Sequence, residues 1–161
     1  MRRTRVAPTS AVAILILAFL LTGCPKRPAV TETPAPPPAA APAVRDFVVN
    51  TELEVIHFDF DSDRIRPPDA AILDKHVAWL KGHPDELLLI AGHADDQGTS
   101  DYNAALGERR ARTAKNYLVS HGVEADRITA SSLGELRPVC TEQTDECRAK
   151  NRRVTFLTKK R

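Results

Sequence analysis

Four segments of the chain have the hydrophobic pattern of a strand. The segment from Glu52 to Phe60 mixes alternating apolar positions with β-branched and aromatic residues. The segment from Leu87 to Ala91 is a continuous apolar run, which suits a central strand covered on both faces. Two further segments, Arg127 to Leu133 and Arg153 to Thr158, predict a third and a fourth strand.

Two amphipathic helices are predicted between these strands. The first begins at Pro67, because proline is tolerated in the first turn of a helix, and ends at Gly82. The second follows a loop rich in glycine and aspartate, Gly92 to Ser100, and ends before Gly122, a common cap residue. A strand, a helix and a strand within about 40 residues imply a right-handed parallel crossover. The elements therefore follow the order β-α-β-α-β-β.

The beginning of the chain is not part of this pattern. Three arginines in the first five residues precede an apolar run of 11 residues, Ala11 to Leu21, which ends in small residues. These features describe a secretory signal peptide, whereas a membrane span needs roughly 20 apolar residues. Leu21-Thr22-Gly23-Cys24 also resembles the lipobox of bacterial lipoproteins, in which the cysteine is acylated. An ordinary cleaved signal that happens to precede a cysteine is the alternative. We predict a lipoprotein signal peptide over residues 1–23 and lipidation of Cys24.

Residues 24–46 are predicted to be a tether. From Pro25 to Asp46 the chain consists largely of Pro, Ala, Thr and Val, with seven prolines and no aromatic residue. Such a segment cannot bury a core, and at ~3.1 Å per residue it reaches at most roughly 70 Å. The globular part is then one small domain over residues 47–161.

Removal of the signal peptide changes the charge and the cysteine count. Three of the 23 basic residues precede Cys24 and all 21 acidic residues follow it, so the chain from Cys24 onward carries a net charge of −1. This balance removes the basis for nucleic-acid binding. Outside the cytosol, Cys140 and Cys147 form an even pair for which we expect a disulfide. Zinc is the alternative, but no second Cys pair or nearby His supplies further ligands.

The second helix contains a conflict between pattern and charge. Arg110 lies in the middle of an apolar stripe that includes Leu106, Ala114 and Leu118. Because an arginine cannot lose its proton, an inward-facing Arg110 needs an anion. The candidate anions are Asp61, Asp95 and Asp96. Either Arg110 and an aspartate neutralise each other, or together they bind a group that carries both charges.

Asp95 lies at the carboxyl end of the second strand, a favoured binding position in α/β sheets. Gly98 lets the backbone turn, and the next helix presents free N–H groups at its beginning. A cation site at Asp95 beside an anion site at Arg110 would suit a zwitterionic group such as an amino acid. An internal salt bridge between these two residues is the alternative.

Residues for catalysis or metal binding are not recognisable. The chain has no Gly-x-Ser-x-Gly elbow, no phosphate loop and no spare cysteine. Asp59, Asp61 and Asp63 alternate, but Arg64 and Ala70 stand where a calcium loop needs glycine and glutamate. We predict no enzymatic activity, no cofactor and no metal.

Several motifs in the right order resemble the family of peptidoglycan-associated lipoproteins that carry an OmpA-like domain. The resemblance covers nearly all of the chain after the signal peptide. It includes the lipobox, the tether, and the motifs Phe58-Asp59-Phe60-Asp61, Gly92-His93-Ala94-Asp95, Gly98-Thr99, Tyr102-Asn103, Leu106-Gly107-Glu108-Arg109-Arg110-Ala111 and Asn151-Arg152-Arg153.

The resemblance implies an α+β fold, an α/β sandwich with a mixed four-stranded sheet and two main helices on one face. It also implies non-covalent binding of the peptidoglycan stem peptide through meso-diaminopimelate. Carried over by position, Asp95 holds the amino group of that residue and Arg110 its carboxylate. The remaining pocket residues are Phe60, Asp61, Asn103, Leu106 and Arg152. Gln97 departs from the family, which often has arginine there, and this change removes one expected polar contact.

The partners implied by the resemblance are peptidoglycan, outer-membrane lipid through acylated Cys24, and the Tol system, notably TolB. The protein is then expected at the periplasmic face of the outer membrane, where it supports envelope integrity and cell division. Two alternative hypotheses share some of these features: a structural OmpA-like lipoprotein outside the Tol system, and an enzyme acting on peptidoglycan. A motor stator protein of the same domain family is disfavoured, because it needs a membrane span where this chain has a lipobox.

Overall fold

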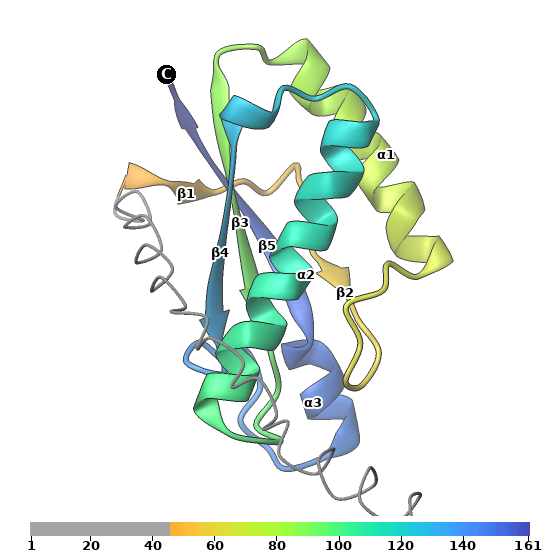
Figure 1. Ribbon diagram of the computed structural model, residues 1–161, viewed down its shortest axis with the longest axis vertical. Coiled ribbons are helices and arrows are strands. Elements are labelled where there is room, and N and C mark those ends of the chain that lie inside the picture. The colour runs from red at the N-terminus through yellow and green to blue at the C-terminus, as the bar shows by residue number, and fades with distance from the viewer. Residues whose placement is uncertain (1–45) are drawn as a thin grey trace, which may run out of the picture. The chain divides into compact units, whose positions relative to one another are not determined.

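The computed structural model describes residues 46–161, which contain a five-stranded sheet, two long helices and one short helix (Figure 1). The predicted signal peptide, the predicted lipidation site Cys24 and nearly all of the predicted tether lie outside the described residues. The strands are β1 (Val48–Val49), β2 (Ile56–His57), β3 (Glu86–His93), β4 (Ile128–Gly134) and β5 (Arg153–Lys160). The helices are α1 (Pro67–Gly82), α2 (Ser100–Ser120) and α3 (Asp145–Asn151), and a single 3₁₀ turn covers Ala125–Arg127.

The sheet is mixed, as predicted, and its order is β1-β5-β3-β4, with β2 also pairing with β5. β5 is antiparallel to β1, β2 and β3, whereas β3 and β4 are parallel. Since β2 and β3 are both antiparallel to β5, they are parallel to each other, and the predicted parallel crossover through α1 is confirmed. Residues 88–93 of β3 are all buried, as expected for a central strand.

The sequence prediction is wrong about the first strand. Instead of one strand from Glu52 to Phe60, only residues 56–57 pair with β5. Leu53, Ile56 and Phe58 are nevertheless buried, whereas Phe60 is exposed, so the segment supplies core side chains without forming one regular strand. After Phe58 the chain turns, with Asp61 at a φ of 50°. The separate strand β1 was not predicted, and both of its valines are exposed, so it shows no alternation of buried and exposed side chains. With β1 the sheet has five strands instead of the predicted four.

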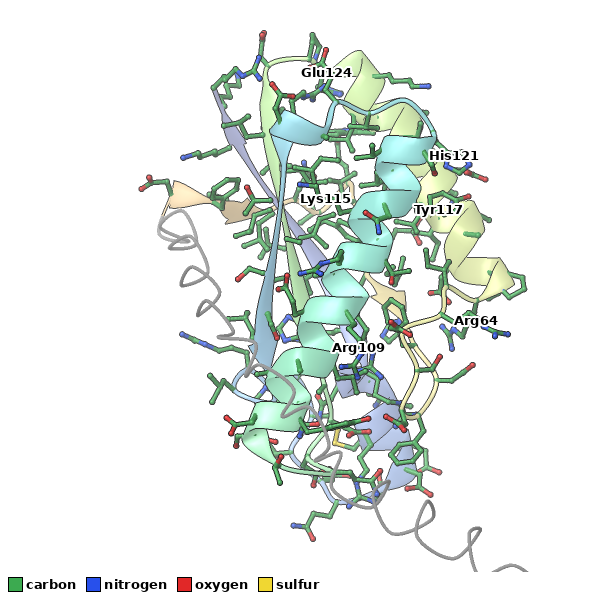
Figure 2. All side chains as sticks on the ribbon, in the orientation of Figure 1. Arg64, Arg109, Lys115, Tyr117, His121 and Glu124 are labelled. Atoms are coloured by element: carbon green, nitrogen blue, oxygen red, sulfur yellow. A yellow bond between two sulfur atoms is a disulfide. The ribbon has the colours of Figure 1, made fainter. Side chains whose placement is uncertain are left out.

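The two long helices lie on the same face of the sheet, as predicted (Figure 1). Their boundaries agree with the predicted proline and glycine signals. Tyr117 of α2 joins the two helices, because its hydroxyl group donates to Asp74 Oδ1 at 2.7 Å in α1. His121 stacks on the Tyr117 ring from the same side of α2 (Figure 2). The main core fills the space between the helices and the sheet and includes Leu73, Leu80, Leu88, Ile90, Ala111, Ala114, Leu118, Val154 and Phe156.

Helix α2 lies unusually close to β3 at one point. A Cβ atom on Gly92 would lie 1.9 Å from the carbonyl oxygen of Gly107, and a Cβ on Gly107 would lie 2.8 Å from the carbonyl oxygen of Gly92. Both positions therefore need glycine for the backbones to meet. This contact fixes the height of α2 against the carboxyl end of β3, where Asp95 and Arg110 lie.

The short helix α3 lies at the end of the sheet opposite the C-terminus (Figure 1) and was not predicted. It has seven residues, most of them polar, and so shows no apolar stripe. Thr144 caps its beginning by accepting a hydrogen bond from Cys147 N at 3.2 Å. The structure joins Cys147 to Cys140 by a disulfide, with their Cα atoms 5.3 Å apart.

Candidate binding site

The side chain of Arg110 is fully buried, and three backbone carbonyls surround it. Its Nε donates to Ser62 O at 2.8 Å, Nη1 to His93 O at 2.8 Å, and Nη2 to Asp59 O at 3.2 Å. The guanidinium also lies over the Phe58 ring, 5.3 Å from its centroid. The prediction that Arg110 faces inward is confirmed, but its direct partners are carbonyl oxygens rather than a carboxylate.

Asp95 pairs with Arg152 and not with Arg110, so the internal salt bridge considered from sequence is wrong. Arg152 Nη1 lies 3.0 Å from Asp95 Oδ2, and Arg152 Nε donates to Phe58 O at 3.2 Å. The other carboxylate oxygen of Asp95 accepts from Gln97 N at 3.3 Å. Asp95 is only 4% exposed, and this pairing compensates much of the cost of burying its charge.

The electrostatics of the site are dominated by the burial of Arg110. The pKa of Arg110 is lowered to about 10, chiefly by burial and to a smaller extent by the neighbouring positive charge of Arg152. Asp95, Asp63 and Asp61 act in the opposite direction and favour the charged form. Arg110 therefore stays protonated at neutral pH, although it is desolvated and next to a second arginine.

A pocket of about 210 Å³ opens in front of these charges. Its walls are Phe60, Asp61, Asp95, Gln97, Gly98, Tyr102 and Leu106. Phe60 and Tyr102 are 62% and 44% exposed, so aromatic surface is available to a ligand at the mouth. The hydroxyl group of Tyr102 donates to Asp61 Oδ1 and ties the loop before α1 to the first turn of α2.

The structure brings most of the predicted site residues together. Asp95, Phe60, Asp61 and Leu106 line the pocket. Arg152 lines an adjoining cavity together with Phe60 and Gln97. Arg110, in contrast, is absent from the lining and lies behind the wall.

Asn103 also lies beneath the pocket rather than in its wall, and it is fully buried. Its Nδ2 donates to Asp95 O at 3.2 Å and to Glu135 Oε2 at 2.6 Å. Asn103 therefore supports the backbone that carries Asp95.

Three contributors were missed from sequence: Tyr102, which lines the pocket, and Arg148 and Glu135, which hold its loops. Tyr102 had a recognisable signal, because it stands beside Asn103 in one of the motifs that carry the family resemblance. Arg148 pairs with Asp96, with Nε 2.8 Å from Oδ1, and holds the pKa of Asp96 below its ordinary value through this hydrogen bond. Glu135 accepts from Ser100 and Asn103, which lowers its pKa. Glu135 follows β4 and Arg148 lies in α3, and no helix or strand was predicted in this part of the sequence.

Within residues 46–161, no group of three or more His, Cys, Asp or Glu side chains is arranged to hold a metal ion. In the same part of the chain, no helix has the length and apolar character needed to cross a membrane.

The comparison with protein families identifies the fold. Residues 57–152, which include every predicted pocket residue, match the model of the OmpA family. The chain belongs to the OmpA family. The mixed sheet with its helices is the OmpA-like fold, and the predicted fold class is confirmed.

Relatives within the OmpA family support this assignment. The chain is 37% identical over 164 residues to the peptidoglycan-associated lipoprotein of Brucella melitensis, an alignment that covers 98% of this chain and 97% of that protein. It is also similar to the crystal structure of the peptidoglycan-associated lipoprotein from Burkholderia pseudomallei, with a TM-score of 0.64 and 37% identity over 65% of this chain and 89% of that one. These names are those of structural lipoproteins and not of enzymes, in agreement with the prediction.

A more distant OmpA-like structure extends the likeness in fold alone. The C-terminal domain of Helicobacter pylori MotB has a TM-score of 0.63 at 22% identity, over 67% of this chain and 85% of that one.

Proposed function

We propose that this protein is an outer-membrane lipoprotein that binds the diaminopimelate residue of the peptidoglycan stem peptide without making or breaking a bond. Residues 1–23 are its signal peptide, residues 24–46 carry the acylated Cys24 and the tether, and residues 47–161 are the binding domain. Acylation with two or more chains gives stable attachment to a membrane, whereas a single chain gives only marginal binding.

The observation that carries this proposal is the presence of both signs of charge at the pocket. The carboxylates of Asp61 and Asp95 line it, and the guanidinium groups of Arg110 and Arg152 lie close to them. The free end of a diaminopimelate side chain carries one ammonium and one carboxylate group. A site that holds both signs of charge suits such a zwitterion, because each charged group of the ligand finds an opposite charge.

Asp95 is the proposed partner of the ammonium group. A carboxylate has about four acceptor sites, and Asp95 uses two of them, for Arg152 and for Gln97 N. The remaining sites are available to a ligand. The exposed Phe60 and Tyr102 rings would contact the methylene groups of the side chain.

Arg110 is the proposed partner of the carboxylate. It donates three of its five N–H groups to carbonyls, which leaves two for a ligand. Because the side chain is fully buried, direct contact requires the loop from Asp59 to Ser62 to shift on binding. Arg152, with 14% of its side chain exposed, offers a second positive charge beside Asp95.

The resulting molecule connects two layers of the envelope. The acyl chains hold one end in the outer membrane and the domain binds one of many identical stem peptides, so a modest affinity suffices through high effective concentration. We further propose that TolB and other Tol proteins are partners. Failure of the full-length protein to capture TolB would instead favour a lipoprotein outside the Tol system.

Co-sedimentation with purified diaminopimelate-type peptidoglycan tests the site. Asp95→Asn removes the proposed ammonium partner at nearly constant volume and should weaken binding at least about tenfold. Asp126→Asn is the matched control, because Asp126 is exposed and lies at the opposite end of the sheet. Circular dichroism establishes that both variants remain folded. Equal binding by Asp95→Asn and the parent would place the site elsewhere.

Peptidoglycan that has lysine in place of diaminopimelate tests the ligand. Lysine lacks the second carboxylate, so we expect weak co-sedimentation of the parent protein with this polymer. Equal binding to the two polymers would contradict the role of Arg110. Release of soluble muropeptides by the purified domain would instead support the enzyme alternative.

A further inference from the structure

Two neighbouring aspartates at the carboxyl end of β3 are each held by an arginine from the α3 region. Arg148 Nε lies 2.8 Å from Asp96 Oδ1, and Arg152 Nη1 lies 3.0 Å from Asp95 Oδ2. The two arginines are four positions apart, which places them on the same side of one helical turn. Only one of the two aspartates, Asp95, lines the pocket in front of Phe60 and Tyr102.

Helix α3 needs outside support to present these arginines. It has seven residues, and an isolated helix of that length is not stable in water. The Cys140–Cys147 disulfide fixes its first turn. Asn151 fixes its last residue, since its Oδ1 accepts from Val139 N at 2.9 Å and Cys140 N at 3.2 Å, and its Nδ2 donates to Cys140 O at 2.7 Å.

These contacts form a continuous path from the disulfide to the pocket. The disulfide and Asn151 hold α3 at its two ends, and Arg148 and Arg152 then hold Asp96 and Asp95. Asp95 in turn accepts from Gln97 N, and Gln97 and Gly98 form the adjoining pocket wall. Gly98 has a φ of 107°, a backbone conformation that residues with a side chain rarely adopt. Glycine at this position therefore allows the turn that shapes the pocket wall.

We propose that α3 and its disulfide act as a clamp that sets the position of Asp95 and the 95–98 loop for the ligand. Arg148 and the Cys140–Cys147 bond are positioning elements that touch no ligand themselves. The inference rests on the proposed binding function. A preset carboxylate binds more tightly than a mobile one, because less conformational freedom is lost on binding.

The test compares the parent with Arg148→Gln and with a Cys140→Ser/Cys147→Ser double variant. We measure the affinity for a soluble diaminopimelate-containing muropeptide, the Tm, and the amide hydrogen exchange of Gln97 and Gly98 in the protein alone. Arg148→Gln should weaken binding by about tenfold and speed exchange at both amides, with a small change in Tm. The double cysteine variant should do the same with a larger loss of Tm.

Two further variants separate clamping from general stability. Arg112→Gln removes a comparable ion pair, with Glu108 at 3.2 Å on the exposed side of α2, and should leave affinity and exchange unchanged. The charge-reversed pair Asp96→Arg/Arg148→Asp restores the attraction between the same positions and should recover most of the affinity that Arg148→Gln loses.

The possible results distinguish failure of the clamp from failure of the proposed binding function. If the parent binds the muropeptide and Arg148→Gln binds within about twofold of it, the clamp is refuted while the binding function stands. If the parent does not bind, the binding function fails, and exchange at Gln97 and Gly98 decides the clamp alone. Unchanged exchange in Arg148→Gln would then overturn it. Arg148→Gln keeps the disulfide, so the clamp stays testable even if the double cysteine variant does not fold.

Discussion

Both ends of the sheet contain a buried arginine that donates to three backbone carbonyls, but the carbonyls have different origins. At the amino end of β3, Arg127 donates to Leu80 O, His83 O and Glu86 O. Leu80 O lies in the last turn of α1 and His83 O in its cap residue, where the regular helical hydrogen bonds end. Arg127 therefore caps α1 and complements its dipole.

At the carboxyl end of β3, Arg110 donates to carbonyls of a loop and a strand end instead. Its charged neighbours include Asp95, Arg152, Asp63 and Asp61, and a pocket lies in front of two of them. A buried arginine is therefore not by itself evidence for a ligand site. The surrounding charges, more numerous than the arginine needs for its own satisfaction, distinguish the binding end from the capping end.

The largest change in the free energy of unfolding is expected for a glycine at the binding end of the sheet, and a glycine at the Arg127 end serves as its control. Gly92→Ala places a Cβ 1.9 Å from a backbone oxygen of α2 and should lower the free energy of unfolding by about 4 kcal/mol or more. Gly82→Ala, near the Arg127 end, meets nothing within 4 Å and should change it by less than about 1 kcal/mol. Urea denaturation measures both. A Gly92→Ala variant as stable as the parent would mean that α2 can move away from β3 freely.

Replacement of each buried arginine is expected to have the next largest effect on the free energy of unfolding. Arg110→Leu and Arg127→Leu each remove the charged donor that three carbonyls share, so each should lower the free energy of unfolding by about 3 kcal/mol. Only Arg110→Leu should also abolish binding to peptidoglycan under conditions where both variants are folded. A gain in stability for Arg110→Leu would show that the cost of burying the charge exceeds its hydrogen bonds.

The smallest effect concerns two buried histidines, one on α1 and one at the binding end. Burial lowers the pKa of both His76 and His93 from 6.5 to about 4. The unfolded chain therefore binds more protons between these values, and stability falls as the pH decreases from about 6.5 to 4. At pH 5 each histidine should cost about 2 kcal/mol.

Chemical denaturation at pH 7 and pH 5 measures this loss, and His76→Leu should remove about half of the histidine contribution. His76 is the cleaner position for the test, because both of its ring nitrogens lack a hydrogen-bond partner. An unchanged pH dependence in that variant would assign the loss to other groups.

The sequence predicted the parts of this molecule that depend on repeated burial. The apolar stripe of α2 correctly placed Arg110 on the inward side of the helix, and the apolar residues of the predicted first strand do supply Leu53, Ile56 and Phe58 to the core, although that strand is shorter than predicted. The partners of Arg110 were not predictable, because Ser62 and Asp59 lie 48 and 51 positions earlier in the chain and contribute backbone oxygens, which any residue carries.

Other features left no pattern in the sequence at all. Arg127 lies directly before β4 and not within an apolar stripe of a helix, so no pattern in the sequence predicted that it is buried. The two exposed valines of β1 and the polar residues of α3 likewise gave no periodic signal.

The position of β1 has a mechanical consequence for the proposed attachment. β1 pairs with Leu157 and Thr158 near the far end of β5, whereas Arg152 and the pocket lie just before its beginning. At ~3.3 Å per residue, the point where the chain enters the sheet is about 20 Å from the site along β5. The two strands are antiparallel, so β1 runs backward along the chain, from Val49 to Val48, in the direction away from the pocket. A pull between membrane and cell wall would therefore run along the strands and load the β1–β5 hydrogen bonds together in shear, instead of opening them one after another.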